Sequence, residues 1–349
     1  MVYRLINYSC GMSRKPKLSD VAQLAGVSVT TASQVLRGAG RISEQTTKRV
    51  LEAAAKLHYV GNEKAASMRS GSNREIGFVI NQIANPFNAE VISGVSDLLE
   101  AEGFLVSILD ARDDPERQHR HLKSFIRSGR AGLLWVPAFG TRPDDEALLQ
   151  SHRVPTVTFL RKLDLNIFDH VGVANHEATL VATHHLLNHG HRKIAYLGGT
   201  TMTSVRQARI AGYETALLSA SESTPIVWDC DDNKMAGVEA VSTLLKKHPQ
   251  ITAVVCNGDM VALGAVLGLQ RLGLSAGRDI SVIGFDDIQD AAASTPALTT
   301  MSICPYNLGK RLAETLLKRL KDPGAPLESV EVTAKLIERD TVGNVHNQI

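Results

Sequence analysis

The stretch "DVAQLAGVSVTTASQVL", residues 20–36, consists of two short apolar-periodic segments joined at a single glycine. The first belongs to a helix expected from about Leu18 to Ala25, with an apolar face formed by residues 21, 22, 24 and 25. Gly26 supplies the backbone freedom that a tight turn needs, and Ser28 is a typical N-cap for a second helix that reaches about Leu36. This spacing predicts a helix-turn-helix.

A third helix is expected to begin after Ser43 and to continue for about four turns. Its apolar residues recur at helical spacing, at Val50, Leu51, Ala54 and Leu57. Helices as short as these are not stable in isolation, so the three must pack on one another.

The second helix carries the side chains that could read DNA. In a helix-turn-helix this helix enters the major groove, where each base pair presents its own pattern of donors, acceptors and methyl groups. Its outward residues are Ser28, Val29, Thr30, Ser33 and Gln34. Val29 can contact a thymine methyl group, Gln34 can form two hydrogen bonds with adenine, and the hydroxyls can bond phosphates or base edges. The alternative is a surface helix that Ser28 merely caps.

The charge distribution favours the DNA-binding interpretation. Residues 13–74 contain eleven Lys/Arg and four Asp/Glu, whereas residues 75–349 contain 26 Lys/Arg and 32 Asp/Glu. A basic segment could also be a disordered tail, but helical periodicity runs throughout this one. It is therefore expected to be a folded module that binds a polyphosphate.

From residue 75 onward, short apolar runs alternate with amphipathic segments of helical length. The runs are "IGFVI" (76–80), "FLVSIL" (104–109), "GLLWVP" (132–137), "VPTVTF" (154–159), "KIAYLG" (193–198), "AVVC" (253–256) and "DISVIGFD" (279–286). This alternation predicts parallel sheets with helices on both faces. Because about 275 residues are more than one sheet needs, we expect two similar lobes with a cleft between them.

The expected organisation has five parts. They are a leader over 1–16, a DNA-binding domain over 17–60, a hinge helix and linker over 61–74, a two-lobed core over 75–340 and a tail over 341–349. Met12 directly precedes the basic "SRKPK", so the native start is expected there, preceded by an incorrectly assigned extension or a disordered leader. Asn62 would cap the brief hinge helix, and "SGS" at 70–72 would form the linker.

Several function classes find no support in the sequence. No apolar run reaches the roughly 18 residues that a membrane-spanning helix needs, and the N-terminus lacks a convincing signal peptide, so a cytoplasmic protein is expected. The cysteines, at positions 10, 230, 256 and 304, are far apart and are interpreted as ordinary thiols. Since no nucleophile elbow, P-loop or dinucleotide-binding glycine motif precedes a suitable helix, neither an enzyme nor a cofactor is expected.

Beyond these patterns, "LSDVAQLAGVSVTTASQVL" resembles the headpiece of the lactose/galactose repressor family of bacterial transcription regulators. The resemblance continues to about Arg339 through "GRISEQTTKRVLEAAAKLHYVGN", "NPF" (85–87), "DDPERQ" (113–118), "HLLNHGHRKIAYLGG" (185–199), "RIAGY" (209–213), "DMVALG" (259–264), "VIGFDD" (282–287) and "PALTT" (296–300). No single match suffices, but so many in order are specific. Among the branches, "GRIS", "NHGHRKIAYLGG" and "HPQITAVVC" are most similar to maltose-regulon repressors.

The resemblance implies an all-α helix-turn-helix headpiece followed by a two-lobed α/β core similar to periplasmic sugar-binding proteins. In such a core, Arg209 would reach polar groups of the effector and Asp286 would accept its hydroxyls. An ordinary ion pair between these two residues, across the lobes, is the alternative. The resemblance also places four further residues in the effector site: Asn81, Phe87, Arg161 and Asp259.

The same resemblance gives the hinge segment a role. In the family, the short helix after the headpiece folds when two subunits lie on an operator, and a leucine from each enters the minor groove. Met68 is at that position, and methionine is among the side chains that unstack a base step. Asn62 is counted with the DNA-contacting residues, whereas Glu63 would lie near the phosphates and weaken the contact. The alternative is that Met68 only packs within a linker.

Three departures from the family pattern point to a distinct ligand and operator. Leu160 stands where an aspartate is frequent, and Gly258 stands where an asparagine is frequent, with Asn257 displaced by one position. Both changes remove groups that usually hold sugar hydroxyls, so a standard hexose site is not expected. Gln34 stands where arginine or leucine is frequent, which predicts an operator particular to this protein.

Two further expectations concern metal and assembly. The histidines of "THHLLNHGH" (183–191) could suggest a metal site, but the stretch matches a helix and turn of the family, so no metal is expected. The sequence after "LIERDTVGN" lacks the leucine heptads of a coiled coil, so a homodimer is expected.

Together these inferences predict a transcriptional regulator, a repressor, that binds a pseudo-palindromic double-stranded operator as a homodimer and is controlled by a sugar-like small molecule. One alternative is a regulator whose effector site is vestigial. Another is a solute-binding protein that serves a transporter, although the basic headpiece and the missing signal peptide argue against it.

Overall fold

The structure is a computed structural model that describes residues 14–60, 73–163, 165–220 and 224–345. The chain divides between Asn73 and Arg74 into two compact units, each with its own core. Within the described residues, no helix is long and apolar enough to cross a membrane.

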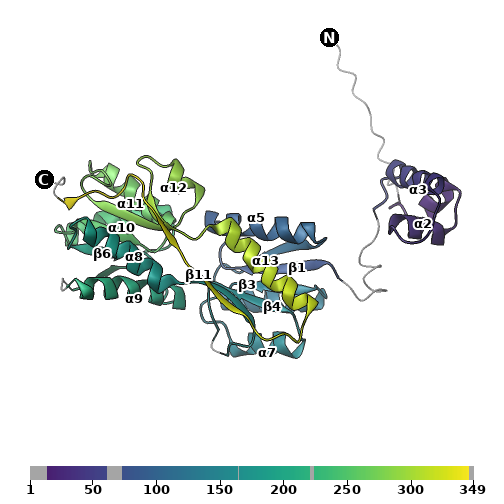
Figure 1. The fold of residues 1–349 in the computed structure, drawn as a ribbon, viewed down its shortest axis with the longest axis horizontal. Coiled ribbons are helices and arrows are strands. Elements are labelled where there is room, and N and C mark those ends of the chain that lie inside the picture. The colour runs from purple at the N-terminus through teal and green to yellow at the C-terminus, as the bar shows by residue number, and fades with distance from the viewer. Residues whose placement is uncertain (1–13, 61–72, 164, 221–223, 346–349) are drawn as a thin grey trace, which may run out of the picture. The chain divides into compact units, whose positions relative to one another are not determined.

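The first unit contains the helix-turn-helix. Its helices are α1 (Leu18–Ala25), α2 (Val29–Leu36) and α3 (Glu44–Lys56). Gly26 ends α1 in the left-handed conformation at a φ of 65°, which glycine adopts without steric cost. The Ser28 side chain then accepts a hydrogen bond from the Thr31 backbone N–H at 3.0 Å and caps α2. The predicted helix-turn-helix is therefore confirmed (Figure 1).

The three helices share a small core, which is narrower than the sequence pattern suggests. Its buried members are Val21, Ala22, Ala25, Ala32, Val35, Val50, Ala53 and Ala54. Leu24 and Leu51 were expected on the apolar faces, but they are 47% and 51% exposed. That part of the prediction is wrong, because three helices of 8, 8 and 13 residues cover only one narrow stripe of each helix.

The second unit consists of two lobes, each built on a six-stranded sheet. The N-terminal lobe has the strand order β11-β5-β4-β3-β1-β2, and all its pairs are parallel. Its strands are β1 (Glu75–Ile80), β2 (Leu105–Asp110), β3 (Gly132–Trp135), β4 (Thr156–Phe159), β5 (Asp169–Val173) and β11 (Ser329–Val332). Helices α5 (Pro86–Ala101) and α13 (Pro305–Lys321) lie side by side on one face, and α6 (Pro115–Arg127) and α7 (Pro143–Ser151) cover the other (Figure 1).

The C-terminal lobe repeats this plan with the strand order β12-β10-β9-β8-β6-β7. Its strands are β6 (Ile194–Leu197), β7 (Ile226–Trp228), β8 (Ala253–Cys256), β9 (Ser281–Asp286), β10 (Thr299–Ser302) and β12 (Lys335–Ile337), of which β12 alone pairs antiparallel. Its helices are α8 (Asn175–Asn188), α9 (Ser204–Ser219), α10 (Lys234–Lys247), α11 (Asp259–Arg271) and the short α12 (Gln289–Ala293). The predicted two-lobed α/β core with parallel sheets is confirmed.

The chain crosses between the lobes three times. It passes from β5 into α8, returns from β10 into α13, and crosses again between β11 and β12. Each lobe therefore contains segments from distant parts of the sequence, and α13 and β11 complete the N-terminal lobe late in the chain (Figure 1).

All seven apolar runs identified in the sequence contain a strand, but five strands were missed. Strands β7, β11 and β12 have only three or four residues and are partly exposed, whereas β5 and β10 are buried but contain histidine, aspartate or threonines. The residues expected to form a tail also belong partly to this core. Thr341 is buried, and its hydroxyl donates to the Val282 carbonyl at 2.7 Å. The boundary predicted after residue 340 therefore falls inside the described core.

Candidate nucleic-acid interface and effector cavity

The residues of α2 and its cap that were predicted to contact DNA differ in how exposed they are. Ser28, Val29 and Thr30 are exposed, while Ser33 and Gln34 are half-buried. The Ser28 hydroxyl forms a hydrogen bond with the Thr31 hydroxyl at 2.8 Å and another with the Thr31 backbone N–H. Both are bonds of a residue that caps the helix. Val29 keeps 49% of its surface exposed and is free to contact a thymine methyl group.

The Gln34 side chain lies beside Gly40. A Cβ atom built at Gly40 would come within 3.6 Å of the Gln34 Cδ atom, so the loop after α2 runs directly along this amide. The position of Gln34 is therefore limited by the loop, which restricts the directions in which its amide can point.

Two exposed arginines near α2 were not singled out from the sequence. Arg37 ends the helix, and its Nε donates to the Ser33 carbonyl at 3.1 Å, while Arg41 lies in the following loop. Both can reach phosphates, and the clustering of basic residues over 13–74 was the available signal. Asn62 and Met68 lie outside the described residues, so their roles at the DNA stay predictions.

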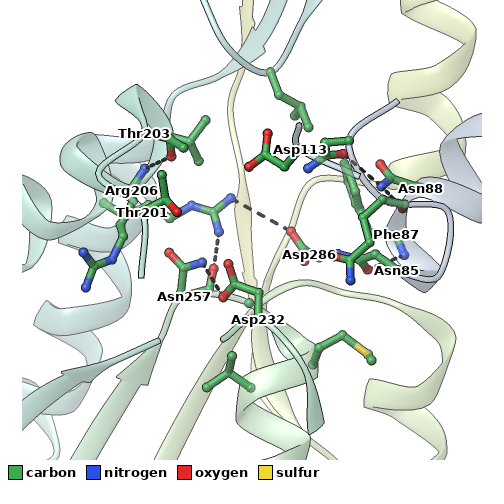
Figure 2. Close-up of a pocket in the computed structure, with 18 of the residues that line it drawn as sticks. Asn85, Phe87, Asn88, Asp113, Thr201, Thr203, Arg206, Asp232, Asn257 and Asp286 are labelled. Carbon is green, nitrogen blue, oxygen red and sulfur yellow. Dashed lines mark hydrogen bonds and ion pairs between the residues drawn. The ribbon is translucent and has the colours of Figure 1, made fainter. Parts of the chain in front are cut away.

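A cavity of about 230 Å³ lies between the two lobes of the core. Its walls are the loops that follow the carboxyl ends of β1, β2 and β4 in one lobe and of β6, β7, β8 and β9 in the other. This is where open parallel sheets bind ligands. Figure 2 shows Asn85, Phe87, Asn88 and Asp113 on one side of the cavity and Thr201, Thr203, Arg206, Asp232 and Asn257 on the other.

Five of the six predicted effector residues line this cavity: Asn81, Phe87, Arg161, Arg209 and Asp286. Asn81 is held by Asn88, whose side-chain N–H₂ group donates to the Asn81 Oδ1 atom at 3.2 Å. The ring of Phe87 is buried and stacks on Phe159 with centroids 6.4 Å apart. The aromatic ring is therefore part of the wall, with little of its face open to a ligand.

Arg209 is fixed on several sides. Its Nε donates to the Asn175 Oδ1 atom at 2.8 Å, and its Nη1 donates to the Asn257 carbonyl. The guanidinium lies over the Phe285 ring, 3.5 Å from the centroid, in a cation–π contact. Its Nη2 is 4.0 Å from Asp286, and both residues belong to the C-terminal lobe. The pair is therefore not a bridge across the lobes, which corrects the alternative considered from the sequence.

Two carboxyl groups face the cavity from the C-terminal lobe, of which Asp286 is buried and Asp232 is exposed. Burial raises the pKa of Asp286 well above its usual value, although the nearby Arg209 opposes this. Desolvation by the surrounding protein also raises the pKa of Asp232, against the hydrogen bond that Asn257 donates to it at 2.8 Å. Asn257 in turn accepts a hydrogen bond from the Tyr196 hydroxyl at 2.6 Å. These groups offer a ligand both donors and acceptors in a site of low dielectric.

Asp259 does not line the cavity, so its predicted role as an effector ligand is wrong. Its side chain is completely buried behind β9. Thr300 donates its hydroxyl proton to the Asp259 Oδ1 atom at 2.6 Å, and the Ile288 backbone N–H donates to Oδ2 at 3.0 Å. Asp259 is the first residue of α11, and its side chain points into the lobe rather than into the cavity. The neighbouring Asn257 and Gly258 line the cavity instead.

The loss of an acid at Leu160 is partly balanced by Asp113. This aspartate comes from the loop after β2 and forms a two-pronged ion pair with Arg161, whose Nη2 lies 3.1 Å from Asp113 Oδ2. Asp113 also accepts the Phe139 backbone N–H at 3.1 Å. The charge of Arg161 is therefore neutralised within its own lobe.

Sequence reasoning missed seven charged or amide residues of the cavity wall: Gln82, Asn85, Asn88, Asp113, Arg206, Asp232 and Asn257. All seven follow the end of a strand or belong to the helix after it, and this position could have identified them wherever the strand itself was predicted. Arg206 donates to Asp229 at 2.5 Å and to the Gly198 carbonyl at 3.1 Å. Asp232 could not be placed because β7 itself was not recognised.

Among the described histidines and cysteines, His191 and Cys230 have ordinary structural surroundings. His191 is buried between the Thr252 hydroxyl and the Gly343 carbonyl, at 2.9 Å from each. The described part of the chain contains no cluster of three or more His, Cys, Asp or Glu residues that could hold a metal ion. Burial raises the pKa of the Cys230 thiol to about 12, so it remains protonated at neutral pH.

Comparison with known proteins agrees with this architecture. Residues 17–62 match the model of the family described as bacterial regulatory proteins, lacI family, and residues 183–342 match a periplasmic binding protein-like domain. The maltose regulon regulatory protein MalI of Escherichia coli is 30% identical over 336 residues, covering 93% of this chain and 98% of the relative. The transcriptional repressor PurR of Vibrio campbellii is 32% identical over 331 residues, covering 93% and 98%.

Solved structures show the same likeness. A lac repressor dimer bound to operator and an anti-inducer has a TM-score of 0.82 at 25% identity and covers 94% of this chain and 99% of its own. A complex of the transcriptional regulator CelR with cellobiose has a TM-score of 0.70 at 26% identity, covering 93% and 99%.

A helix-turn-helix unit joined to a two-lobed core with a polar cavity defines a ligand-controlled DNA-binding regulator. The chain belongs to the LacI family of bacterial regulatory proteins. It is similar to regulatory proteins and repressors rather than to enzymes, as the sequence predicted.

Proposed function

We propose that the protein is a cytoplasmic repressor that binds a pseudo-palindromic operator as a homodimer and responds to a small polar effector. An effector that prefers one arrangement of the lobes shifts the protein toward that arrangement, and operator affinity changes by the same coupling free energy. The observation that carries this proposal is the presence, in one chain, of an exposed α2 surface and of a polar cavity between the lobes of the core.

The cavity supports a polyhydroxylated ligand better than a nucleobase. Arg209, Asp286, Asp232 and the amides of the opposite wall supply donors and acceptors on both sides. A nucleobase needs a flat stacking surface, yet Phe87, the aromatic residue among the described lining residues, is buried against Phe159. The ligand is therefore proposed to be a sugar or a sugar derivative.

Selection of bound genomic DNA tests the proposal most directly. The purified full-length protein should enrich a small number of sites that share an inverted repeat, and genes beside those sites would indicate the effector. Calorimetry with a panel of sugars and nucleosides should then give heat with a sugar. Enrichment of random fragments would contradict sequence-specific regulation.

A regulator with a vestigial cavity is the second candidate. The observation in its favour is that the charges of Arg161 and Arg206 are already paired with Asp113 and Asp229. In that case specific DNA binding would persist while no ligand in the calorimetric panel gives heat.

Replacing Gln34 with alanine is expected to relax base preference at one or two operator positions and to cost about 1–3 kcal/mol of binding free energy, since one two-bonded base contact is lost. Competition binding with single-base operator variants measures both quantities. Gln45→Ala, which removes an exposed glutamine from α3, serves as the matched control. An unchanged base preference in Gln34→Ala would remove Gln34 from the reading surface.

A further inference from the structure

The turn formed by residues 286–289 connects the cavity to the opposite lobe. It starts at Asp286, which lines the cavity, and it ends at Gln289, the first residue of α12. Asp286 and Asp287 have positive φ values of 117° and 63°. Residues other than glycine hold such conformations only where their surroundings fix them, so the contacts of this turn determine its shape.

Asp259 fixes the middle of the turn. Its carboxylate accepts the Ile288 backbone N–H with one oxygen and the Thr300 hydroxyl of β10 with the other, so it ties the turn to the sheet. This close packing requires a glycine in β9, because a Cβ atom at Gly284 would lie 2.1 Å from the Asp259 Oδ1 atom. Arg339 secures the turn from the other side by donating to Asp287 at 2.7 Å.

Glu90 of α5 meets the end of the turn from the N-terminal lobe. Its Oε1 atom accepts the Gln289 backbone N–H at 3.1 Å. Across the described residues, this is the one hydrogen bond or ion pair that joins the two lobes outside the three crossover segments. The negative charge of Glu90 also contributes to the raised pKa of Asp286 at the start of the turn.

We propose that the turn of residues 286–289 transmits occupancy of the cavity to the N-terminal lobe, with Asp259 and Glu90 as positioning residues. The inference rests on the proposed function of the cavity as the effector site. Asp286 and Gln289 are only three residues apart, and Asp259 holds Ile288 between them. Because the turn is fixed at this point, we expect a change in the contacts of Asp286 to alter the direction of the Gln289 N–H. Glu90 accepts that N–H, and the strength of this contact changes with the position of the lobes.

Hydrogen exchange of the Gln289 amide, measured on the full chain without ligand, tests the lobe contact. Glu90→Ala should accelerate this exchange about tenfold, since a hydrogen bond to a charged acceptor is lost. Glu90→Gln retains an oxygen that can accept the N–H and should restore protection to within about threefold of the original. Glu100→Ala, which removes an exposed glutamate from the same helix, is the control and should have no effect. Unchanged exchange in Glu90→Ala would overturn the role of Glu90.

The same measurement tests transmission along the turn. Asp259→Asn cannot accept with both side-chain atoms, so it should accelerate exchange at Gln289 as well as at Ile288. Asp286→Ala should change Gln289 exchange in the original protein but not in a Glu90→Ala background. If Asp259→Asn accelerates exchange only at the Ile288 amide, Asp259 holds the turn locally and does not act on Gln289. If Asp286→Ala changes Gln289 exchange equally in the original protein and in the Glu90→Ala background, transmission through Glu90 is refuted. Because no ligand is used, failure of the calorimetric panel would leave these results standing.

Discussion

Arg209→Ala is expected to abolish the effect of ligand on operator binding while leaving operator binding itself intact. Arg209 offers the cavity a charged donor, and its guanidinium also holds Asn175, the Asn257 carbonyl and the Phe285 ring together. Its removal leaves the buried Asp286 without its cation, which should lower the free energy of unfolding by about 3–5 kcal/mol. The response is measured as operator affinity with and without the ligand found by calorimetry.

Two further variants separate charge from geometry. Arg209→Lys keeps the positive charge but not the planar fork, so it should recover part of the stability without the response. Arg278→Ala removes an exposed arginine paired with Asp279 and should change neither the stability nor the response. An Arg209→Ala protein that still responds fully to ligand would show that the cavity is not the effector site.

Asp259 should make the stability of the core depend on pH. Burial raises the pKa of this carboxyl to about 7, against the hydrogen bonds from Thr300 and Ile288 that favour its charged form. The folded state therefore holds a proton between about pH 4 and pH 7 that the unfolded state releases. The contribution of Asp259 to the free energy of unfolding is fully present below about pH 4. It falls as pH rises toward 7, by at most about 1.4 kcal/mol per pH unit.

Asp259→Asn should remove this slope. The amide loses the Ile288 hydrogen bond, so the variant should be less stable at pH 5 by about 1–3 kcal/mol, and the difference should shrink by pH 8. Urea unfolding can be followed by tryptophan fluorescence, because both tryptophans, Trp135 and Trp228, are in the core and one lies in each lobe. Asp144→Asn, on the exposed start of α7, is the control. A stability difference that is the same from pH 5 to pH 8 would contradict the assignment.

The sequence predicted those parts of the fold that depend on local pattern. Gly26 and Ser28 specify the turn and cap of the headpiece by their own chemistry, and continuous apolar runs such as residues 132–135 mark buried parallel strands. Leu24 could not be placed, because its burial depends on how closely α2 and α3 approach it. Strand β10, "TTMS", is buried only because neighbouring elements satisfy its threonines, which no local pattern reveals.

The residues of the cavity were also predicted only in part. Arg209 and Asp286 were identified through the family resemblance, and both line the cavity. Asp259 was misplaced because a resemblance in sequence gives a position along the chain but not the direction of a side chain. Asp113 was missed because its partner, Arg161, is 48 residues away, and only the fold brings the two together.

The three crossovers determine when the protein can act during its synthesis. The headpiece is complete by residue 60, but β5 lacks its second neighbour until β11 ends at Val332, and β10 lacks its second neighbour until β12 ends at Ile337. At 5–20 residues per second, the interval is on the order of tens of seconds. During it, the nascent chain carries a finished helix-turn-helix but neither lobe is complete, so both lobes, and the cavity between them, become functional at almost the same moment.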